Sequence, residues 1–262
     1  MESVSLVAGS DLGRTRAEIV EEAAELILPY WRSDLAVDRK ADESPVTEAD
    51  RRAEELILQR LAKLYPKVPV IAEEQVETLG KTPDKAPKRF FLVDPLDGTK
   101  GFVRGTEAFT VNIGLIEDGI PVGGAVAAPA TGQVWFTTPD GAFRRKVKGN
   151  DLTQIRVRQK PASGGVALVS HTLTDEEAQR LAGRHGCPVW QGMDSSVKFC
   201  LIAEGRADIY PRPGRTMEWD TAAADAILRA AGGRVLTDDG QPLIYGKAAE
   251  GFANPGFLAV GG

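Results

Sequence analysis

The sequence contains few of the side chains that many hydrolases and zinc enzymes use for catalysis. Its 262 residues include 2 histidines, His171 and His185, and 2 cysteines, Cys187 and Cys200. With so few histidines, a Ser-His-Asp hydrolase or a histidine-rich metal site is a poor candidate. The cysteines fit no zinc or CxxC spacing, so we interpret both as reduced structural thiols.

Long apolar segments and an excess of positive charge are also absent. The apolar runs are far shorter than the roughly 20 residues of a membrane span, and the N-terminal segment MESVSLVAGSDLGR does not resemble a secretory signal. Lys plus Arg number 32 and Asp plus Glu 37, a net charge of −5. This balance argues against a nucleic acid polymer as partner. We expect a cytoplasmic protein without a transmembrane segment, and peripheral membrane association stays open.

The pattern of hydrophobic residues predicts a folded protein with two halves. Helical spacing is present over residues 11–31 and 47–64, and short strands are predicted at 68–72 and 90–93. After about residue 150 the pattern changes to alternating strands and helices. We therefore expect an N-terminal α+β half, residues 1–150, and a C-terminal α/β half, residues 151–262, packed closely together.

One segment, LVDPLDGTKGFVRG at residues 92–105, ends a predicted strand with two aspartates. Pro95 can start a tight turn where the strand ends, and Gly98 allows close approach of a ligand to the backbone. Such a turn could direct Asp94, the Leu96 carbonyl and Asp97 at one point, an all-oxygen set that suits Mg²⁺ or Mn²⁺. An ordinary surface turn is an equally good interpretation of these residues alone.

Other acidic residues occur where they could join this turn. Glu73 and Glu74 follow the strand at 68–72, Asp220 precedes an alanine-rich helix, and Asp50 follows Thr47 at a helix start. Each has a structural alternative: an acidic loop for the glutamates, a helix N-cap for Asp220 and a capping box for Asp50. Two carboxylates about 4 Å apart repel by several kcal/mol, and bound divalent cations reverse that repulsion.

Two motifs give the chain a family resemblance. VDPLDGTKGF and, further along, WDTAAADAILRAAGG match the signatures D-P-[IL]-D-G-T and W-D-x-A-A of the inositol monophosphatase superfamily, which the chain resembles over most of its length. VTEAD and AEE occupy the expected places. The resemblance implies a layered αβαβα sandwich with the active site where the two halves meet. It also implies a Mg²⁺-dependent, lithium-sensitive phosphatase.

Finer features resemble one branch of that superfamily, the bacterial 3′(2′),5′-bisphosphate nucleotidases. They are GTKGF, EAFTVNIGLIEDGIPVGGAV, SSVKFCLIAEGRADIYPR and the terminal NPGF. The resemblance implies removal of the 3′-phosphate from adenosine 3′,5′-bisphosphate, a by-product of sulfur metabolism, to give AMP and phosphate. The alternatives are an inositol-1-monophosphatase, a histidinol-phosphatase and a non-catalytic sensor of metal or nucleotide. Relatives occur as monomers and dimers, so a homodimer stays open.

The resemblance also implies a set of metal ligands. Glu73, Asp94 and the Leu96 carbonyl would bind a first Mg²⁺, and Asp94, Asp97 and Asp220 a second. A third, weaker ion would lie near Glu73, and Mn²⁺ could substitute. Most of these ligands belong to the N-terminal half, and Asp220 belongs to the C-terminal half.

The remaining site residues follow from the same resemblance. Glu73 and Thr99 would generate and orient the attacking hydroxide without a covalent intermediate, with Asp50 accepting the hydroxyl proton of Thr99. The backbone N–H groups of Gly98 and Thr99 would hold the scissile phosphate. The nucleotide would be bound by residues of the C-terminal half: His171, Ser195, Lys198 and Arg212. Lysine and arginine there make sense because an acidic protein needs local cations to bind a second phosphate.

Overall fold

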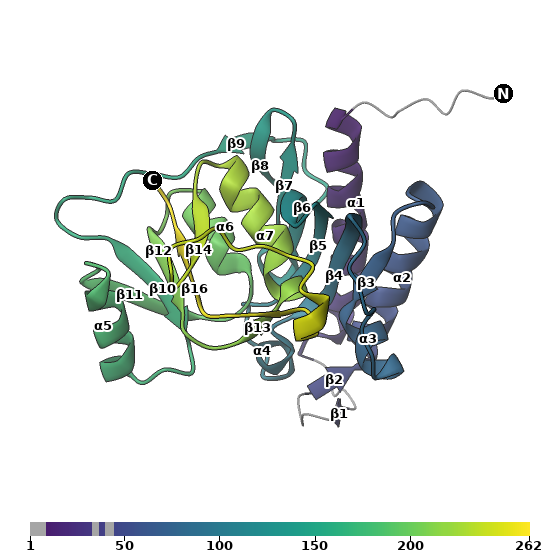
Figure 1. Ribbon diagram of the computed structural model, residues 1–262, viewed down its shortest axis with the longest axis horizontal. Coiled ribbons are helices and arrows are strands. Elements are labelled where there is room, and N and C mark those ends of the chain that lie inside the picture. The colour runs from purple at the N-terminus through teal and green to yellow at the C-terminus, as the bar shows by residue number, and fades with distance from the viewer. Residues whose placement is uncertain (1–8, 33–36, 40–44) are drawn as a thin grey trace.

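The computed structural model describes residues 9–32, 37–39 and 45–262, which are arranged in five layers (Figure 1). From right to left in Figure 1 these are a helix pair, a sheet, a second helix pair, a second sheet and one outer helix. The described α-helices are α1 (Gly9–Ile27), α2 (Glu48–Leu64), α3 (Glu73–Leu79), α4 (Thr99–Val103), α5 (Asp175–Arg184), α6 (Val197–Ala203) and α7 (Glu218–Ala230). Short 3₁₀ helices are η1 (Leu28–Tyr30), η2 (Pro129–Thr131) and η3 (Ala248–Glu250).

The larger sheet has seven strands in sequence order: β3 (Val70–Ala72), β4 (Arg89–Asp97), β5 (Thr110–Glu117), β6 (Ile120–Ala128), β7 (Gln133–Thr138), β8 (Gly141–Lys146) and β9 (Thr153–Ile155). Only its first pair, β3 and β4, is parallel. Both faces are covered, so β4 is apolar on both: Phe91 and Val93 face one hydrophobic cluster and Phe90 and Leu92 the other. This explains the continuous hydrophobic run before the two aspartates.

The outer face of this sheet is covered by α1 and α2. Ile19, Val20, Ala23 and Ile27 of α1 are fully buried there, at the helical spacing that the sequence predicts. The helix gives way to η1 at residue 28 because Pro29 has no N–H to donate. At the start of α2, the predicted capping box of Thr47 and Asp50 is confirmed.

The inner face of the sheet is covered by α7, which lies very close to β5 and β6, and α6 packs beside α7. A Cβ added at Gly124 of β6 would stand 2.0 Å from the carbonyl oxygen of Ala223, and one at Gly114 of β5 would stand 2.8 Å from the Cβ of Ala222. The glycines of these strands and the alanines of α7 therefore bring helix and sheet into backbone contact. This contact sets the position of Asp220 in the first turn of α7.

The second sheet has the order β11-β10-β12-β16-β14, with strands β10 (Val166–Ser170), β11 (Val189–Met193), β12 (Ile209–Arg212), β14 (Arg234–Thr237) and β16 (Phe257–Val260). Strand β10 is parallel to both of its neighbours, and β16 is antiparallel to both of its neighbours. Helix α5 packs on β10 and β11 from outside. Two small pairs complete the list: β1 (Val37–Arg39) with β2 (Pro45–Thr47), and β13 (Thr216–Met217) with β15 (Ala253–Asn254).

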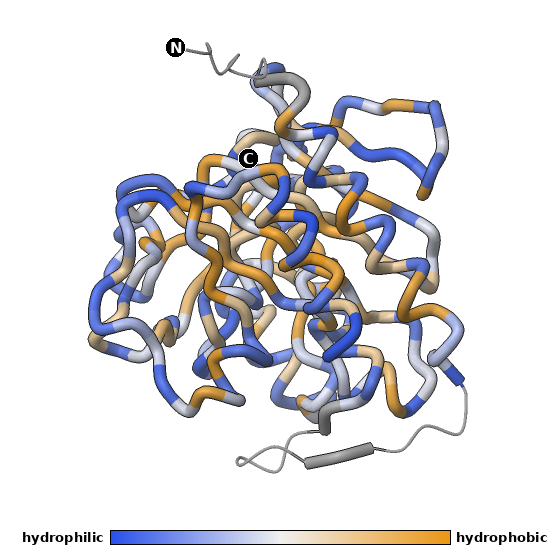
Figure 2. The backbone as a smooth tube through the Cα atoms, turned by 90° about the vertical axis from the view of Figure 1, so that its right-hand side faces the viewer, coloured by the Kyte–Doolittle hydropathy of each residue, from blue (hydrophilic) through white to orange (hydrophobic). Residues whose placement is uncertain are grey.

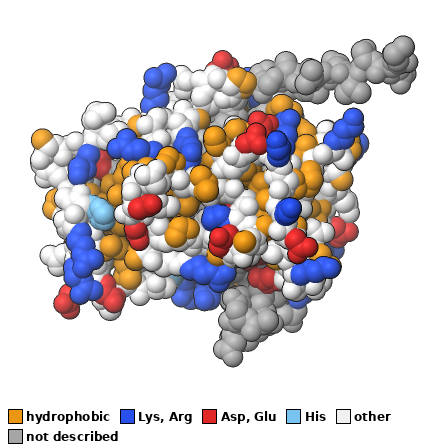
Figure 3. All heavy atoms as spheres, viewed as in Figure 1, with side chains coloured by type: hydrophobic (Ala, Val, Ile, Leu, Met, Phe, Trp, Pro, Cys, Tyr) orange, Lys and Arg blue, Asp and Glu red, His pale blue; other side chains and the backbone are white. Residues whose placement is uncertain are grey.

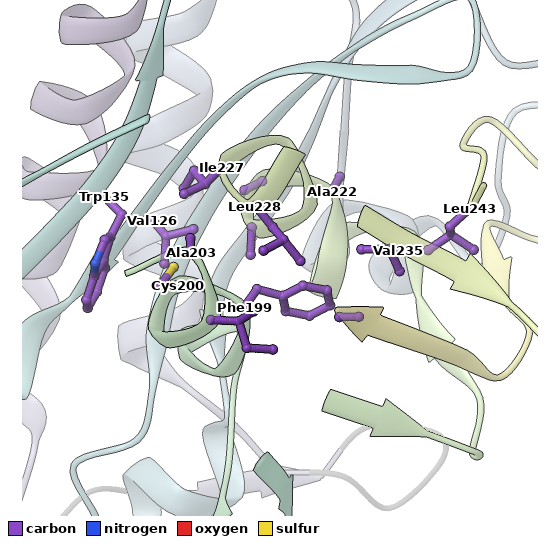
Figure 4. Close-up of a cluster of buried hydrophobic side chains, with 14 of the residues drawn as sticks. Val126, Trp135, Phe199, Cys200, Ala203, Ala222, Ile227, Leu228, Val235 and Leu243 are labelled. Atoms are coloured by element: carbon purple, nitrogen blue, oxygen red, sulfur yellow. The ribbon is translucent and has the colours of Figure 1, made fainter. Parts of the chain in front are cut away.

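The largest hydrophobic cluster fills the middle layer between the two sheets. Side chains from α6, α7 and both sheets meet in it (Figure 4): Val126, Trp135, Phe199, Cys200, Ala203, Ala222, Ile227, Leu228, Val235 and Leu243. Along the backbone, hydrophobic segments gather in the interior and hydrophilic ones at the outer turns (Figure 2). Charged side chains of both signs are scattered over the face seen in Figure 3. Among the described residues, no helix has the length and apolar character needed to span a bilayer.

The layered αβαβα architecture predicted from the family resemblance is confirmed, but two local predictions are wrong. Strand β4 does not end in a turn at Asp94; pairing with β5 resumes at Asp97 after a bulge. Pro95 lies in that bulge, where its missing N–H breaks no ladder hydrogen bond. Helix α3 was not predicted and occupies part of an expected loop. The larger sheet includes β9, just past residue 150, and the division into residues 1–150 and 151–262 stays a prediction.

Candidate active site

A cavity of about 480 Å³ lies between the C-terminal ends of β3 and β4 and the loops of the second sheet. Predicted site residues from both halves of the chain line it: Glu73, Asp97, Gly98, Thr99, His171, Ser195, Lys198, Arg212 and Asp220. The other three, Asp50, Asp94 and Leu96, are 1% exposed. The fold therefore collects all the predicted residues in and directly behind one cavity.

Asp94 lies at the centre of the acidic cluster. Its Oδ1 accepts a hydrogen bond from the backbone N–H of Leu96, 3.0 Å away, across the bulge. Burial raises the pKa of Asp94 well above its usual value, and the neighbouring charges of Glu73, Asp97 and Asp220 raise it further. Carboxyl groups from three elements, α3, β4 and α7, therefore act together at Asp94.

Asp97 is held by groups from both halves of the molecule. Its Oδ2 accepts hydrogen bonds from the backbone N–H of Ser196, at 2.5 Å, and from the hydroxyl of Thr110, at 3.3 Å. Burial raises the pKa of Asp97, while the charge of Lys198 and these two hydrogen bonds act in the opposite direction. The carboxylate is thus fixed at the junction of β4, β5 and the start of α6.

Thr99 begins α4 directly after Gly98, which has a φ of 92°. A side chain at position 98 is excluded because a Cβ would stand 2.9 Å from the carbonyl oxygen of Ala108. The Thr99 hydroxyl lies 2.9 Å from the Leu96 carbonyl oxygen and 3.3 Å from Asp50 Oδ1. Thr99 and Asp50, which are far apart in sequence, are therefore in contact.

The capping box at the start of α2 orients the Asp50 carboxylate. Asp50 Oδ2 accepts hydrogen bonds from the backbone N–H of Thr47, at 2.8 Å, and from its hydroxyl, at 2.6 Å. This directs Oδ1 towards Thr99. Asp50 can therefore cap the helix and contact the site at the same time, because the capping box uses Oδ2 and the contact with Thr99 uses Oδ1.

Asp220 is the third residue of α7, so the alternative of Asp220 as the N-cap is wrong. The N-cap is Met217, whose N–H donates to Asp220 Oδ2 at 2.8 Å. The helix starts earlier because the loop before η3 holds Glu218. The Glu218 carboxylate accepts hydrogen bonds from the backbone N–H groups of Gly246 and Lys247. It also forms an ion pair with Lys247 Nζ at 2.7 Å. This buried anchor places Asp220 at the cavity.

The acidic cluster has the donor chemistry of a site for hard divalent cations. Among the described residues, no three Asp, Glu, His or Cys side chains are already arranged so that they could hold a metal ion. The negative charges of Glu73, Asp97 and Asp220 all act on the buried carboxyl group of Asp94 and raise its pKa. A cation bound by these oxygens would offset that repulsion, so the chemistry of these residues fits a hard divalent metal.

The opposite side of the cavity carries cations. Lys198 is 4% exposed, and its Nζ donates to the carbonyls of Ser195, at 2.7 Å, and Met193, at 3.2 Å. Burial lowers the pKa of Lys198 to about 8. Arg212 also lines the cavity, and its buried Nε has no hydrogen-bond partner among the described residues. A ligand anion could satisfy both groups.

His171 stands at the rim of the cavity with a defined ring orientation. Its Nε2 lies 2.7 Å from the guanidinium of Arg104, which can only donate, so Nε2 is the acceptor. Nδ1 then carries the hydrogen and donates to the carboxylate of Asp194. The ring is fixed between α4 in the first half and the loop after β11 in the second.

Several site residues were missed by the sequence analysis. Thr110 contacts Asp97, and Asp194, Ser196 and Tyr210 line the cavity. The sequence analysis assigned none of them a role, although Thr110, Ser196 and Tyr210 lie within the segments that carry the family resemblance. A signal for Thr110 was present, because polar residues alternate with apolar ones along β5 in a strand that is otherwise hydrophobic. The others became visible only when α6 and the second sheet were placed against β4.

Comparison with known proteins gives a consistent picture. The family model described as Inositol monophosphatase family matches residues 11–259. The chain is 41% identical over 242 residues, 92% of this chain and 96% of the other, to the 3′(2′),5′-bisphosphate nucleotidase CysQ of Salmonella typhimurium. It is 37% identical over the same length, with the same coverage, to CysQ of Escherichia coli K12. The crystal structure of CysQ from Bacteroides thetaiotaomicron is similar with a TM-score of 0.80 and 32% identity, covering 97% of this chain and 98% of that one.

Proposed function

This chain belongs to the inositol monophosphatase family, whose enzymes are metal-dependent, and we propose that it removes the 3′-phosphate of adenosine 3′,5′-bisphosphate to give AMP and phosphate. The proposed activity is that of a 3′(2′),5′-bisphosphate nucleotidase and belongs to sulfur metabolism. The observation that carries the proposal is the pairing of four carboxylates with Lys198 and Arg212 across one cavity. Carboxylates attract metal ions, and the cations suit a second phosphate group.

The proposed metal ligands are Glu73, Asp94 and the Leu96 carbonyl for one Mg²⁺, and Asp94, Asp97 and Asp220 for another, with a third, weaker ion near Glu73. When bound, divalent cations neutralise the phosphate oxygens and lower the pKa of a coordinated water. The structure supports this set because Asp94, the ligand common to both ions, is buried among the charges of Glu73, Asp97 and Asp220. Mn²⁺, which takes similar oxygen ligands, would serve as a substitute.

Side chains of the protein itself would orient the attacking water and the hydrogen atoms around it. Thr99 Oγ1 would accept a hydrogen bond from the attacking water and release its own hydroxyl hydrogen towards Asp50 Oδ1, 3.3 Å away. Asp50 is ready for this because its other oxygen is held by Thr47. Glu73 lines the cavity nearby and would help to orient the water. The N–H groups of Gly98 and Thr99, at the start of α4, would hold the scissile phosphate.

The second half would bind the remainder of the nucleotide. Lys198 and Arg212 supply positive charge for the 5′-phosphate, and Ser195 supplies a hydroxyl at the same wall. The His171 ring, with its orientation set by Arg104 and Asp194, offers a flat surface for the nucleoside. These roles explain why the substrate would carry two phosphates.

Phosphate release tests the proposal. We expect hydrolysis of adenosine 3′,5′-bisphosphate that requires Mg²⁺ and is inhibited by Li⁺, with kcat/KM well above that for inositol 1-phosphate or histidinol phosphate. A higher kcat/KM for either rival substrate would overturn the substrate assignment. Binding of nucleotide without hydrolysis in saturating Mg²⁺ would favour the sensor alternative. A trapped phosphoenzyme would overturn direct attack by water.

Lys198→Met provides a sharper test of the second phosphate. The variant should raise KM for the bisphosphate more than for a nucleoside 3′-monophosphate, because only the bisphosphate presents the 5′-phosphate to Lys198. Equal losses on both substrates would contradict this role. Two further proposals, a homodimer and a cytoplasmic location, are open to light scattering and cell fractionation.

A further inference from the structure

Two polar side chains, Thr110 and Asn112, lie in an otherwise apolar strand beside the acidic cluster. Both belong to β5, where alternate residues share a face, and both are fully buried. Across the β4–β5 pair Thr110 stands opposite Asp97 and Asn112 stands opposite Asp94. Buried polar groups destabilise a fold when they lack a hydrogen-bond partner, so the contacts of these two residues call for an explanation.

Ser196 joins these two residues to Asp97. Its backbone N–H donates to Asp97 Oδ2 at 2.5 Å, and its hydroxyl oxygen lies 2.9 Å from Thr110 Oγ1 and 2.7 Å from the amide of Asn112. Thr110 Oγ1 in turn lies 3.3 Å from Asp97 Oδ2. The side chains thus form a continuous line of contacts from Asn112 through Ser196 and Thr110 to the carboxylate.

The hydrogens along this line can be assigned by counting donors. The two hydroxyls carry one hydrogen each, and the line contains three side-chain contacts. With Asp97 ionised, all three are hydrogen bonds only if Asn112 supplies the third hydrogen. With the amide oxygen against Ser196, the Asn112 Nδ2 is buried and has no partner among the described residues. A half-turn of the amide places Nδ2 against Ser196 and leaves an unpartnered oxygen, which proteins tolerate more often than an unpartnered N–H.

We propose that Asn112, Ser196 and Thr110 form a directed chain of hydrogen bonds, Asn112 to Ser196 to Thr110 to Asp97, and that they are positioning residues for this carboxylate. The inference rests on the proposed function, in which Asp97 is a metal ligand. Every donor in this chain of hydrogen bonds points towards Asp97, so the chain fixes the Oδ2 side of the carboxylate. The carboxylate is then held ready for a cation before the cation arrives.

The same chain makes assembly of the acidic cluster depend on contact between the two halves. Ser196 precedes α6, and its neighbour Ser195 has a φ of 57°, a left-handed conformation that is unfavourable for a residue with a side chain. This conformation brings the Ser196 N–H to Asp97 and the Ser195 carbonyl to Lys198 Nζ. The loop that would bind the nucleotide therefore also positions the carboxylate that would bind the metal.

Titration of the free enzyme with a metal ion tests the proposed chain of hydrogen bonds without relying on turnover. Thr110→Val and Ser196→Ala should weaken Mn²⁺ or Mg²⁺ binding, measured by calorimetry, by about 10–100-fold, the usual effect of losing a residue that supports a metal ligand. Thr110→Ser should restore affinity to within about threefold because the hydroxyl returns. Thr137→Val, which removes a buried hydroxyl elsewhere in the sheet, should lower the melting temperature without changing metal affinity.

The direction of the hydrogen-bond chain is tested by Asn112→Leu, which keeps the branched shape of the side chain but removes the donor. Metal binding should weaken several-fold; unchanged or tighter binding would overturn the direction. If wild-type protein hydrolyses the bisphosphate but Thr110→Val and Ser196→Ala bind metal as tightly as wild type does, the positioning role is wrong. If the wild-type protein binds no divalent cation and shows no hydrolysis, the proposed function itself fails.

Discussion

Substituting Gly124 by alanine tests how the position of α7 controls the site. The added Cβ would stand 2.0 Å from the Ala223 carbonyl oxygen, whereas real Cβ atoms essentially never approach closer than 3.0 Å. The obstacle is helix backbone, not a flexible side chain, so α7 and β6 must separate by about 1 Å. Asp220 lies in the first turn of the same helix and would move with it.

This displacement should reduce both stability and activity. Overpacking a filled interior costs about 1–3 kcal/mol, and each kcal/mol lowers the melting temperature of a protein of this size by about 2–4 °C. A shift of about 1 Å at a catalytic centre can cost about 10²-fold in rate. We therefore expect kcat/KM for the bisphosphate to fall by about two orders of magnitude and Mg²⁺ binding to weaken, with the fold retained.

Thermal unfolding, calorimetric titration with Mg²⁺ and phosphate release measure these effects. Gly183→Ala in α5 is a matched control, since nothing lies within 4 Å of its added Cβ and alanine is the better helix former. It should raise the melting temperature slightly and leave activity unchanged. The reasoning would be refuted if Gly124→Ala matched wild type in both stability and Mg²⁺ affinity, because α7 would then not be in tight contact with β6.

Three further predictions concern charge. Asp97→Asn should lower kcat by orders of magnitude while the melting temperature without metal stays the same or rises, since a repelling buried charge is removed; near-normal turnover would exclude Asp97 from the metal site. Mg²⁺ at about 100 times its Kd should stabilise wild type by about 2.7 kcal/mol, seen as a higher melting temperature that chelation abolishes and Asp97→Asn lacks. Asp208 is buried, which raises its pKa, but hydrogen bonds from Arg158 and Val166 outweigh burial and hold the pKa below its usual value. A depressed carboxyl pKa gives stability that is present above about pH 4 and is lost as the pH falls through the folded-state value. The difference in melting temperature between wild type and Asp208→Asn should therefore be large at pH 7 and shrink towards pH 3, while exposed Asp151→Asn should show little difference at either pH; a constant gap would contradict the pairing.

Local signals in the sequence predicted the elements that carry the site but not their ends. The capping box at Thr47 and Asp50 was readable because both partners lie within one helical turn. The strand before Asp94 was readable from its apolar run, yet its continuation through Pro95 to Asp97 was not. That continuation depends on a bulge against Thr110, a residue of the neighbouring strand.

Within the site, the sequence alone identified residue types and motifs, and the family resemblance identified which of them to expect together. It could not show that Asn112 and Ser196 act together with Asp97, because their contacts join segments that are far apart in the sequence. Their role arises from contacts between residues 84 positions apart.

By itself the sequence determined the buried face of α1, the start of α2, the glycine at position 98 and the supply of carboxylates, since each depends on neighbouring residues only. The tertiary structure alone decided which carboxylates meet and which oxygens the protein holds. Electrostatic and hydrogen-bonding interactions act over a few ångströms, and those distances between β4, α6 and α7 are set when the two sheets pack on the middle helices.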